Sequence, residues 1–263
     1  MLLQNKTAII YGAAGAVGSA IARGFAVEGA NVFLAGRHLP SVEAVARSIL
    51  ANGGKAEAAE VDALDEAEVE AHLAAVAGKA GSIDVSFNAI GIPQTGIQGI
   101  SLADLPVDGF MLPVTTYARA QFLTARAAGK HMAERGTGVI LMHTPEPARL
   151  GATFVGGMGP AWAGMESLSR ALSAEFGRQG VRAVVLRSTG LPETATIDLV
   201  FDLHAKAMGI KRQEFQAMVE SMTHRGRSTT LQELADVAAF LASDKAGAIT
   251  GTVANLTAGL IVD

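Results

Sequence analysis

The chain has 263 residues, of which 49% are hydrophobic and 17% charged, with no cysteine. This length fits one large α/β domain, and the lack of cysteine excludes disulfides, a thiolate nucleophile and cysteine-based metal centres. The net charge of −4, without a Lys/Arg cluster, argues against nucleic acid or an anionic membrane surface as a partner. No secretory signal pattern or long apolar run is present, so we expect a soluble cytoplasmic protein.

Short apolar runs alternate with amphipathic helical segments along nearly the whole chain. Apolar runs predict strands at Thr7–Gly12, Asn31–Ala35, Lys55–Val61, Ile83–Phe87, Val139–His143, Val181–Leu186 and Val253–Leu256. Apolar residues at helical spacing lie between them, including a long helix around Tyr117–Glu134. This alternation predicts a single-domain α/β fold over residues 1–263, a Rossmann-type doubly wound parallel sheet of about seven strands.

A glycine-rich turn lies directly between the first strand and the first helix. Residues 11–18 read YGAAGAVG. Glycines at Gly12, Gly15 and Gly18 permit a tight reversal, close approach of backbone N–H groups to an anion and close helix packing. Taken alone, the turn could be only a tight connection. After the first strand of an alternating chain, it predicts a dinucleotide site.

The end of the second predicted strand bears on the type of dinucleotide. Rossmann proteins that bind NAD place a carboxylate there for the ribose hydroxyls. This chain instead has Ala35-Gly36-Arg37-His38. Arg37 can pair with a 2′-phosphate, so the sequence favours NADP(H) over NAD(H). A solvated surface arginine is the alternative interpretation.

The chain resembles the short-chain dehydrogenase/reductase family over nearly its whole length. The turn is similar to the family's TGxxxGxG motif, Asn88-Ala89-Ile90-Gly91 to its NNAG segment, and Gly190-x-x-x-Thr194 to the end of its PGxxxT segment. Asp62-Ala63 resembles the family's adenine-holding aspartate segment, and Gly226–Gly259 its C-terminal helix and strand. The resemblance implies a cofactor site formed by Gly12, Ala14, Gly15, Val17, Gly18, Arg37, Asp62, Ala63, Asn88, Ala89, Gly91 and Thr194. It also implies a homotetramer that pairs two long helices, around Tyr117–Glu134 and Gly159–Arg178.

The family's catalytic residues are where the sequence departs from the pattern. The family uses Tyr-x-x-x-Lys, with a serine upstream and an asparagine on the preceding long helix. When the chain is anchored on Ala174–Gly177, the tyrosine falls on Met158, the lysine on Trp162 and the serine on Pro145. The chain contains only two tyrosines, and neither is followed by a lysine four residues later. We therefore predict a site that lacks the standard pair.

Two side chains are candidate substitutes for the missing proton donor. Tyr117 falls at or next to the family's asparagine position, and His143 ends the fifth predicted strand. Each also has a structural alternative: Tyr117 as a buried space-filling residue, and His143 pointing into the helix layer. Glu146 and Glu193 are further possible donors, but as loop carboxylates we expect them to be solvated. The histidine spacings give no support for a metal site.

Residues 190–227 have no regular pattern but many apolar side chains, and they correspond to the family's substrate-covering segment. They could close as a lid over an apolar small-molecule substrate, or serve core packing or an oligomer contact. Met158, Trp162 and Met165 predict an apolar cleft.

Two functions remain open. One is an NADP(H)-dependent oxidoreductase whose proton comes from Tyr117, His143 or solvent. The other is a non-catalytic member that binds a dinucleotide or apolar ligand, or serves as a scaffold.

Overall fold

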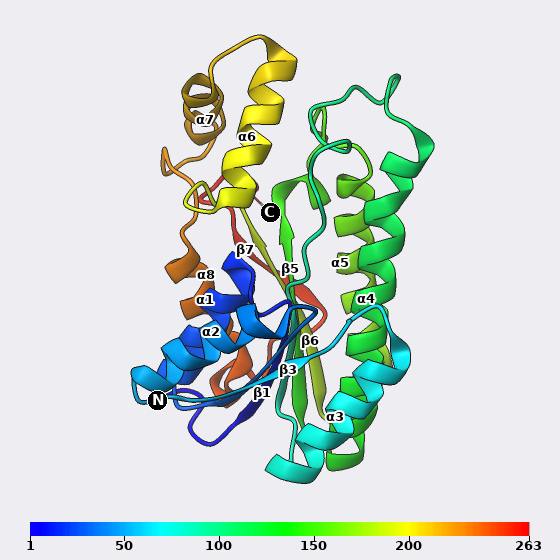
Figure 1. The fold of residues 1–263 in the computed structure, drawn as a ribbon, viewed down its shortest axis with the longest axis vertical. Helices are drawn as coiled ribbons and strands as arrows, with labels where there is room; N and C mark the ends of the chain where they lie inside the picture. Colours follow the sequence, from blue (N-terminus) through cyan, green and yellow to red (C-terminus); the bar gives the residue numbers. More distant parts are fainter. Residues whose placement is uncertain (263) are drawn as a thin grey trace.

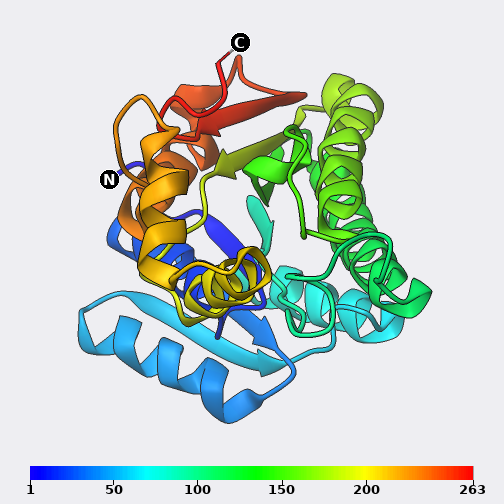
Figure 2. The same ribbon diagram turned by 90° about the horizontal axis from the view of Figure 1, so that it is seen from above.

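The computed structural model describes residues 1–262, which form one seven-stranded sheet between two helix layers (Figures 1 and 2). The strands are β1 (Thr7–Tyr11), β2 (Asn31–Gly36), β3 (Lys55–Glu60), β4 (Val85–Asn88), β5 (Gly138–Pro145), β6 (Val181–Ser188) and β7 (Thr252–Leu256). All pairings are parallel, in the order β3-β2-β1-β4-β5-β6-β7. The predicted fold class is confirmed.

Helices cover both faces of the sheet, as the apolar strands require. They are α1 (Ala16–Val27), α2 (Leu39–Ala51), α3 (Glu66–Ala80), α4 (Val107–Arg135), α5 (Met158–Phe176), α6 (Ala195–Met208), α7 (Arg212–Ser221) and α8 (Leu231–Ala242). Short helical turns are η1 (Glu146–Ala148), η2 (Gly177–Gln179) and η3 (Asp244–Ala246). None of the helices within residues 1–262 is both long and apolar enough to cross a membrane.

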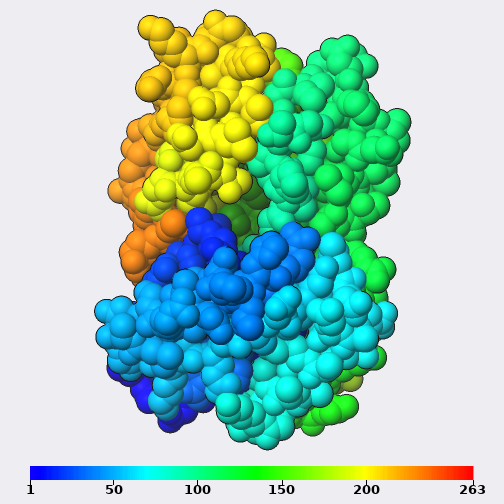
Figure 3. All heavy atoms as spheres, viewed as in Figure 1, coloured from blue at the N-terminus to red at the C-terminus, as the bar shows by residue number. Residues whose placement is uncertain are grey.

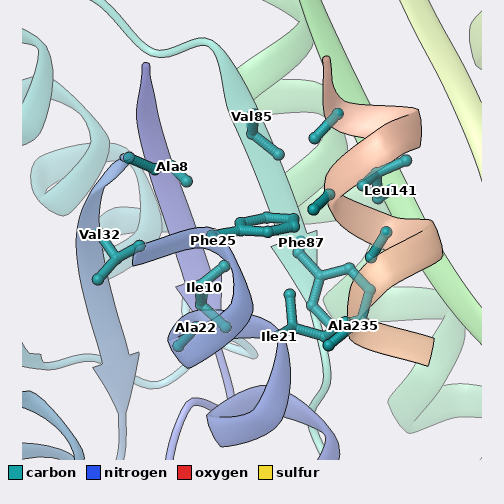
Figure 4. Close-up of a cluster of buried hydrophobic side chains, with 14 of the residues drawn as sticks. Ala8, Ile10, Ile21, Ala22, Phe25, Val32, Val85, Phe87, Leu141 and Ala235 are labelled. Atoms are coloured by element: carbon teal, nitrogen blue, oxygen red, sulfur yellow. The ribbon is translucent and has the colours of Figure 1, made fainter. Parts of the chain in front are cut away.

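Two hydrophobic cores fix the layers. Successive residues of a strand face opposite sides, so Ile10 packs beneath α1 and α8 whereas Ile9 packs beneath the α3–α5 layer. Figure 4 shows the first core, where Phe25 of α1 lies over Phe87 of β4. Both phenylalanines are fully buried. This packing holds α1, and with it the glycine-rich turn, against the centre of the sheet.

Helix α4 begins ten residues before the predicted start at Tyr117, because packing offsets an internal proline. Pro113 is buried in the second turn of the helix. A Cβ on Gly157 would lie 1.9 Å from the Phe110 carbonyl oxygen and 3.0 Å from Pro113 Cγ. The missing side chain at Gly157 therefore lets the early turns of α4 pack where the sequence suggested a loop.

The segment at 190–227, irregular in the sequence pattern, contains α6 and α7. Phe201 and Phe215 join the two helices, with ring centroids 5.3 Å apart in an edge-on contact. With Val200 and Ala205 they form a small core separate from the two main ones. The pair rises above the carboxyl ends of the strands (Figure 1).

Candidate active site

A cavity of about 910 Å³ opens at the carboxyl ends of the strands. It extends from the β1–α1 turn, past the ends of β4 and β5, to the inner side of α6 and α7. The space-filling view is hollowed here, between the yellow surface of α6 and the facing green segments (Figure 3). Parallel α/β sheets bind ligands at this edge, where the strand order reverses between β1 and β4.

The cavity brings together all but one of the predicted cofactor-site residues, together with both candidate proton donors. The predicted residues that line it are Gly12, Ala14, Gly15, Val17, Arg37, Asp62, Ala63, Asn88, Ala89, Gly91, Tyr117, His143 and Thr194. Gly18 does not line it. A Cβ at Gly18 would lie 2.4 Å from the Gly12 carbonyl oxygen, so this glycine serves the packing of α1 against the turn.

The glycine-rich turn leaves backbone donors facing the cavity. Gly15 is the N-cap of α1, and no side chain caps the first turn of that helix. Uncapped N–H groups at a helix N-terminus, together with the helix dipole, form a site for an anion. Gly12 has φ +69° and lies against the backbone of Ala89, which seats the turn on the end of β4. This arrangement fits a dinucleotide pyrophosphate.

Arg37 and Asp62 stand at the β2 side of the cavity. Arg37 is exposed, and no ion pair holds its guanidinium among residues 1–262. Asp62 Oδ1 accepts a hydrogen bond from Leu64 N at 2.9 Å. The first residue offers a cation to a phosphate, and the second is a carboxylate already oriented by its own loop.

Asn88 and Thr194 are engaged with the protein itself. Asn88 Nδ2 donates to Ala120 O at 3.2 Å and to Thr124 Oγ1 at 3.0 Å, both on α4. Thr194 is the N-cap of α6, where its hydroxyl accepts from Ile197 N at 3.3 Å and donates to Leu191 O at 2.9 Å. Both side chains therefore hold loops of the cavity wall in place.

Met158 and Trp162, the positions predicted for the family's tyrosine and lysine, differ in exposure. Met158 is completely buried and does not line the cavity, which corrects its expected place in the cleft. Trp162, one turn further along α5, lines the cavity together with Met165. The wall here is apolar because of Trp162 and Met165.

Tyr117 and His143 reach the same cavity from α4 and β5. Burial raises the pKa of Tyr117 to about 12 and lowers that of His143 to about 4. His143 Nε2 lies 2.8 Å from Ser188 Oγ, in hydrogen-bond contact. At neutral pH both side chains are therefore uncharged, and the imidazole is tied to β6.

The pKa of His143 predicts a pH-dependent loss of stability. The unfolded chain takes up a proton near pH 6.5, but the folded chain does so only near pH 4. Stability is therefore lost as the pH falls through this window, by about 3 kcal/mol. In His143→Gln this contribution to the pH dependence should be missing. The test compares the free energy of unfolding in urea, at several pH values, between this variant and the unaltered protein. The exposed His38→Gln is the control, and an equal pH dependence in His143→Gln would contradict the assignment.

Glu146, predicted to be a solvated loop carboxylate, instead lies in the wall of the cavity. It lines the cavity, and its Oε2 atom is shielded from solvent without a hydrogen-bond partner. Its burial depends on the packing of η1 against α5, which no local pattern reveals. Glu193 is exposed and accepts a hydrogen bond from Leu231 N at the start of α8, outside the cavity lining.

Helices α6 and α7 form the apolar roof of the cavity. Met208, Phe215, Met218, Val219 and Met222 line it from this side. A polar link fastens the roof to the loop after β4: His204 donates from Nε2 to Gln98 Oε1 at 3.0 Å, and Gln98 donates to Gln94 Oε1 at 2.6 Å. Among residues 1–262, no cluster of three or more His, Asp or Glu residues could hold a metal ion.

A glycine-rich turn at the switch point of a doubly wound sheet defines the Rossmann class. The family model described as Enoyl-(Acyl carrier protein) reductase matches residues 12–260. The uncharacterized oxidoreductase YxbG of Bacillus subtilis (strain 168) is 33% identical over 249 residues, covering 95% of this chain and 88% of the relative. The L-rhamnose 1-dehydrogenase (NAD(P)(+)) of Azotobacter vinelandii is 31% identical over 270 residues, covering 100% and 99%. The solved structure of levodione reductase has a TM-score of 0.87 and 26% identity, covering 98% of both chains.

The chain belongs to the short-chain dehydrogenase/reductase family and is one of its oxidoreductases.

Proposed function

We propose that this protein is an NADP(H)-dependent oxidoreductase that works without the Tyr-x-x-x-Lys pair. The observation that carries the proposal is the single cavity that joins the uncapped start of α1 and Arg37 to Tyr117 and His143. In this cavity Gly15 and Val17 would hold the pyrophosphate, and Asp62 the adenosine end. Bound there, the nicotinamide supplies or accepts a hydride. The protein holds the substrate beside Tyr117, His143 and Trp162.

The cofactor preference is tested by fluorescence titration with NADPH and NADH. Trp162 is the only tryptophan, so its emission reports on this cavity. We expect NADPH to bind more tightly than NADH. In Arg37→Ala the preference should fall by about 10- to 100-fold, the effect of a lost charge-assisted hydrogen bond to phosphate. The control is Arg47→Ala, which removes an exposed arginine paired with Glu43 on α2.

An unchanged preference in Arg37→Ala would remove the NADP(H) assignment. Failure of the unaltered protein to bind either dinucleotide would remove the proposed function altogether.

The substrate side of the cavity favours an apolar molecule. The names of several relatives refer to sugars or polyols, such as L-rhamnose and D-threitol. In this chain the roof is mainly methionine, phenylalanine and valine, and its His204 is already bonded to Gln98, so a row of substrate hydroxyls would find few partners there. We therefore propose a carbonyl compound with an apolar body, held under α6 and α7 as a lid. Faster turnover of polyols than of aryl ketones or cyclic diketones would contradict this.

A non-catalytic role is the second candidate. It is favoured by the sequence itself, where Met158, Trp162 and Pro145 stand at the family's catalytic positions. Such a protein would bind a dinucleotide or an apolar ligand as a sensor, or act as a scaffold. Hydride transfer to any carbonyl, imine or enone in a broad panel would decide against it.

We further propose a cytoplasmic homotetramer. Exposed small residues Gly164, Ala171 and Ala174 on α5 would permit close helix approach, and Phe122 on α4 is 46% exposed. Sedimentation of the purified protein measures this assembly.

A further inference from the structure

Glu146 is placed in the cavity by a rigid segment of backbone. It is the first residue of η1, directly after β5 ends at Pro145. Its carbonyl accepts from Arg149 N at 3.0 Å and from Leu150 N at 3.1 Å. Pro145 and Pro147 on either side each have a fixed φ, which limits the backbone conformations open to this turn. The carboxyl group lies beside the backbone N–H of Gly190, which also lines the cavity.

The surroundings of this carboxyl group disfavour its charge. No cation pairs with it, and its Oε2 has no hydrogen-bond partner among residues 1–262. Burial raises its pKa to about 7, although the backbone N–H groups of Glu146 and Gly190 act in the opposite direction. Near neutral pH the group therefore exists in both forms, which suits an acid or base.

Of the other titratable groups of the cavity, Tyr117 and His143 have pKa values that burial moves away from neutrality, and the rest are paired or further away. Those that line it are Arg37, His38, Asp62, Tyr117, His143 and His204. Arg37, His38 and Asp62 lie beyond β2 and β3, separated from β5 by β1 and β4. On α5, which packs against η1, the nearby carboxylate of Glu166 is paired with Arg187. His204 is tied to Gln98, and burial lowers its pKa.

We propose, building on the proposed oxidoreductase function, that the Glu146 carboxyl group is the proton donor and acceptor of this site. In the reductive direction the substrate carbonyl carbon gains a hydride from the reduced nicotinamide, which is thereby oxidised. The C=O π bond opens, and its electron pair takes the proton from the Glu146 carboxyl at the substrate oxygen. An alcohol and the Glu146 carboxylate result, and the carboxylate is reprotonated from solvent. In the oxidative direction, Glu146 accepts the hydroxyl proton.

The first test follows the Glu146 proton without any turnover. Protein labelled with ¹³C at the glutamate carboxyl carbons is titrated by NMR, and one resonance should shift with a midpoint near pH 7. This resonance should be missing in Glu146→Gln. It should remain in Glu175→Gln, a matched change on the exposed side of α5.

The second test separates cofactor binding from proton transfer. In Glu146→Gln the Kd for NADPH should stay within about threefold, while kcat for reduction of benzil, an apolar diketone, falls by about 100- to 10,000-fold. Glu146→Asp keeps the acid but moves it, and should recover part of the rate. It also keeps the test valid if the glutamine variant folds poorly. Glu175→Gln should keep the full rate.

The outcomes distinguish this inference from the proposed function. Failure of the unaltered protein to bind NADPH would overturn both. NADPH binding together with full activity in Glu146→Gln, or a Glu146 resonance that titrates at the ordinary pKa of a glutamate, would overturn the role of Glu146 alone.

Discussion

Replacing Glu166 with alanine should lower the free energy of unfolding by about 3–5 kcal/mol, because it leaves the Arg187 charge buried and unpaired. Arg187 on β6 donates from Nε to Glu166 Oε1 at 2.8 Å and from Nη2 to Oε2 at 2.7 Å. Thr144 on β5 donates to the same carboxylate at 3.0 Å. The two charged side chains are only 6% and 7% exposed. Urea unfolding measures the loss.

Two further variants make this result specific. Glu43→Ala breaks the exposed pair with Arg47 and should cost about 0–1 kcal/mol. Replacing Glu166 and Arg187 together by leucine and methionine should restore most of the lost stability, since no charge is then left unpaired. A loss below about 1 kcal/mol in Glu166→Ala alone would show that the Arg187 charge is not buried as described.

Gly12→Ala is expected to cost about 2–5 kcal/mol of folding stability and to disrupt the cofactor site. Its φ of +69° strains an L residue by about 1–2 kcal/mol. Its Cβ would lie 2.6 Å from the carbonyl carbon and oxygen of Ala89, and overpacking of this kind costs about 1–3 kcal/mol. The turn would have to move away from the end of β4. Thermal or urea unfolding measures the change.

Gly15→Ala is the matched control in the same turn. Its φ of −71° suits any residue, and the nearest atom to its Cβ is 3.4 Å away. We expect a stability change within about 0.5 kcal/mol. The new methyl group faces the cavity, so NADPH affinity should still decrease. If Gly12→Ala is as stable as Gly15→Ala, the close packing of Gly12 against the Ala89 backbone at the end of β4 would be contradicted.

The cavity wall formed by the end of β5, η1 and α5 differs in chemistry from the pattern that the family resemblance predicts. Pro145, which the sequence predicts at the family's serine position, has no side-chain donor, and the chain passes from it into η1, where Glu146 lines the cavity. Trp162, predicted at the lysine position, adds apolar surface to the cavity wall. Burial raises the pKa of Glu146 to about 7, which is the physical condition for a glutamate that can both give and take a proton near neutral pH.

The order of apolar runs and turns determined the fold of this protein. Each predicted strand is present with its ends displaced by at most two residues, because strand periodicity and glycine punctuation are local properties. The glycine-rich turn and the place of Arg37 directly after β2 could likewise be predicted, since each depends on only a few consecutive residues.

Tertiary structure alone decided the features that depend on contacts between distant segments. Gly157 leaves space for the first turns of α4, a helix start that the internal Pro113 made hard to predict. The contact between Phe201 and Phe215 joins two helices in a stretch whose sequence has no regular pattern. The raised pKa of Glu146 is a third case. From the sequence, a glutamate between two prolines is predicted to be solvated. Only the tertiary structure shields its Oε2 atom from water, and this burial raises the pKa of the carboxyl group.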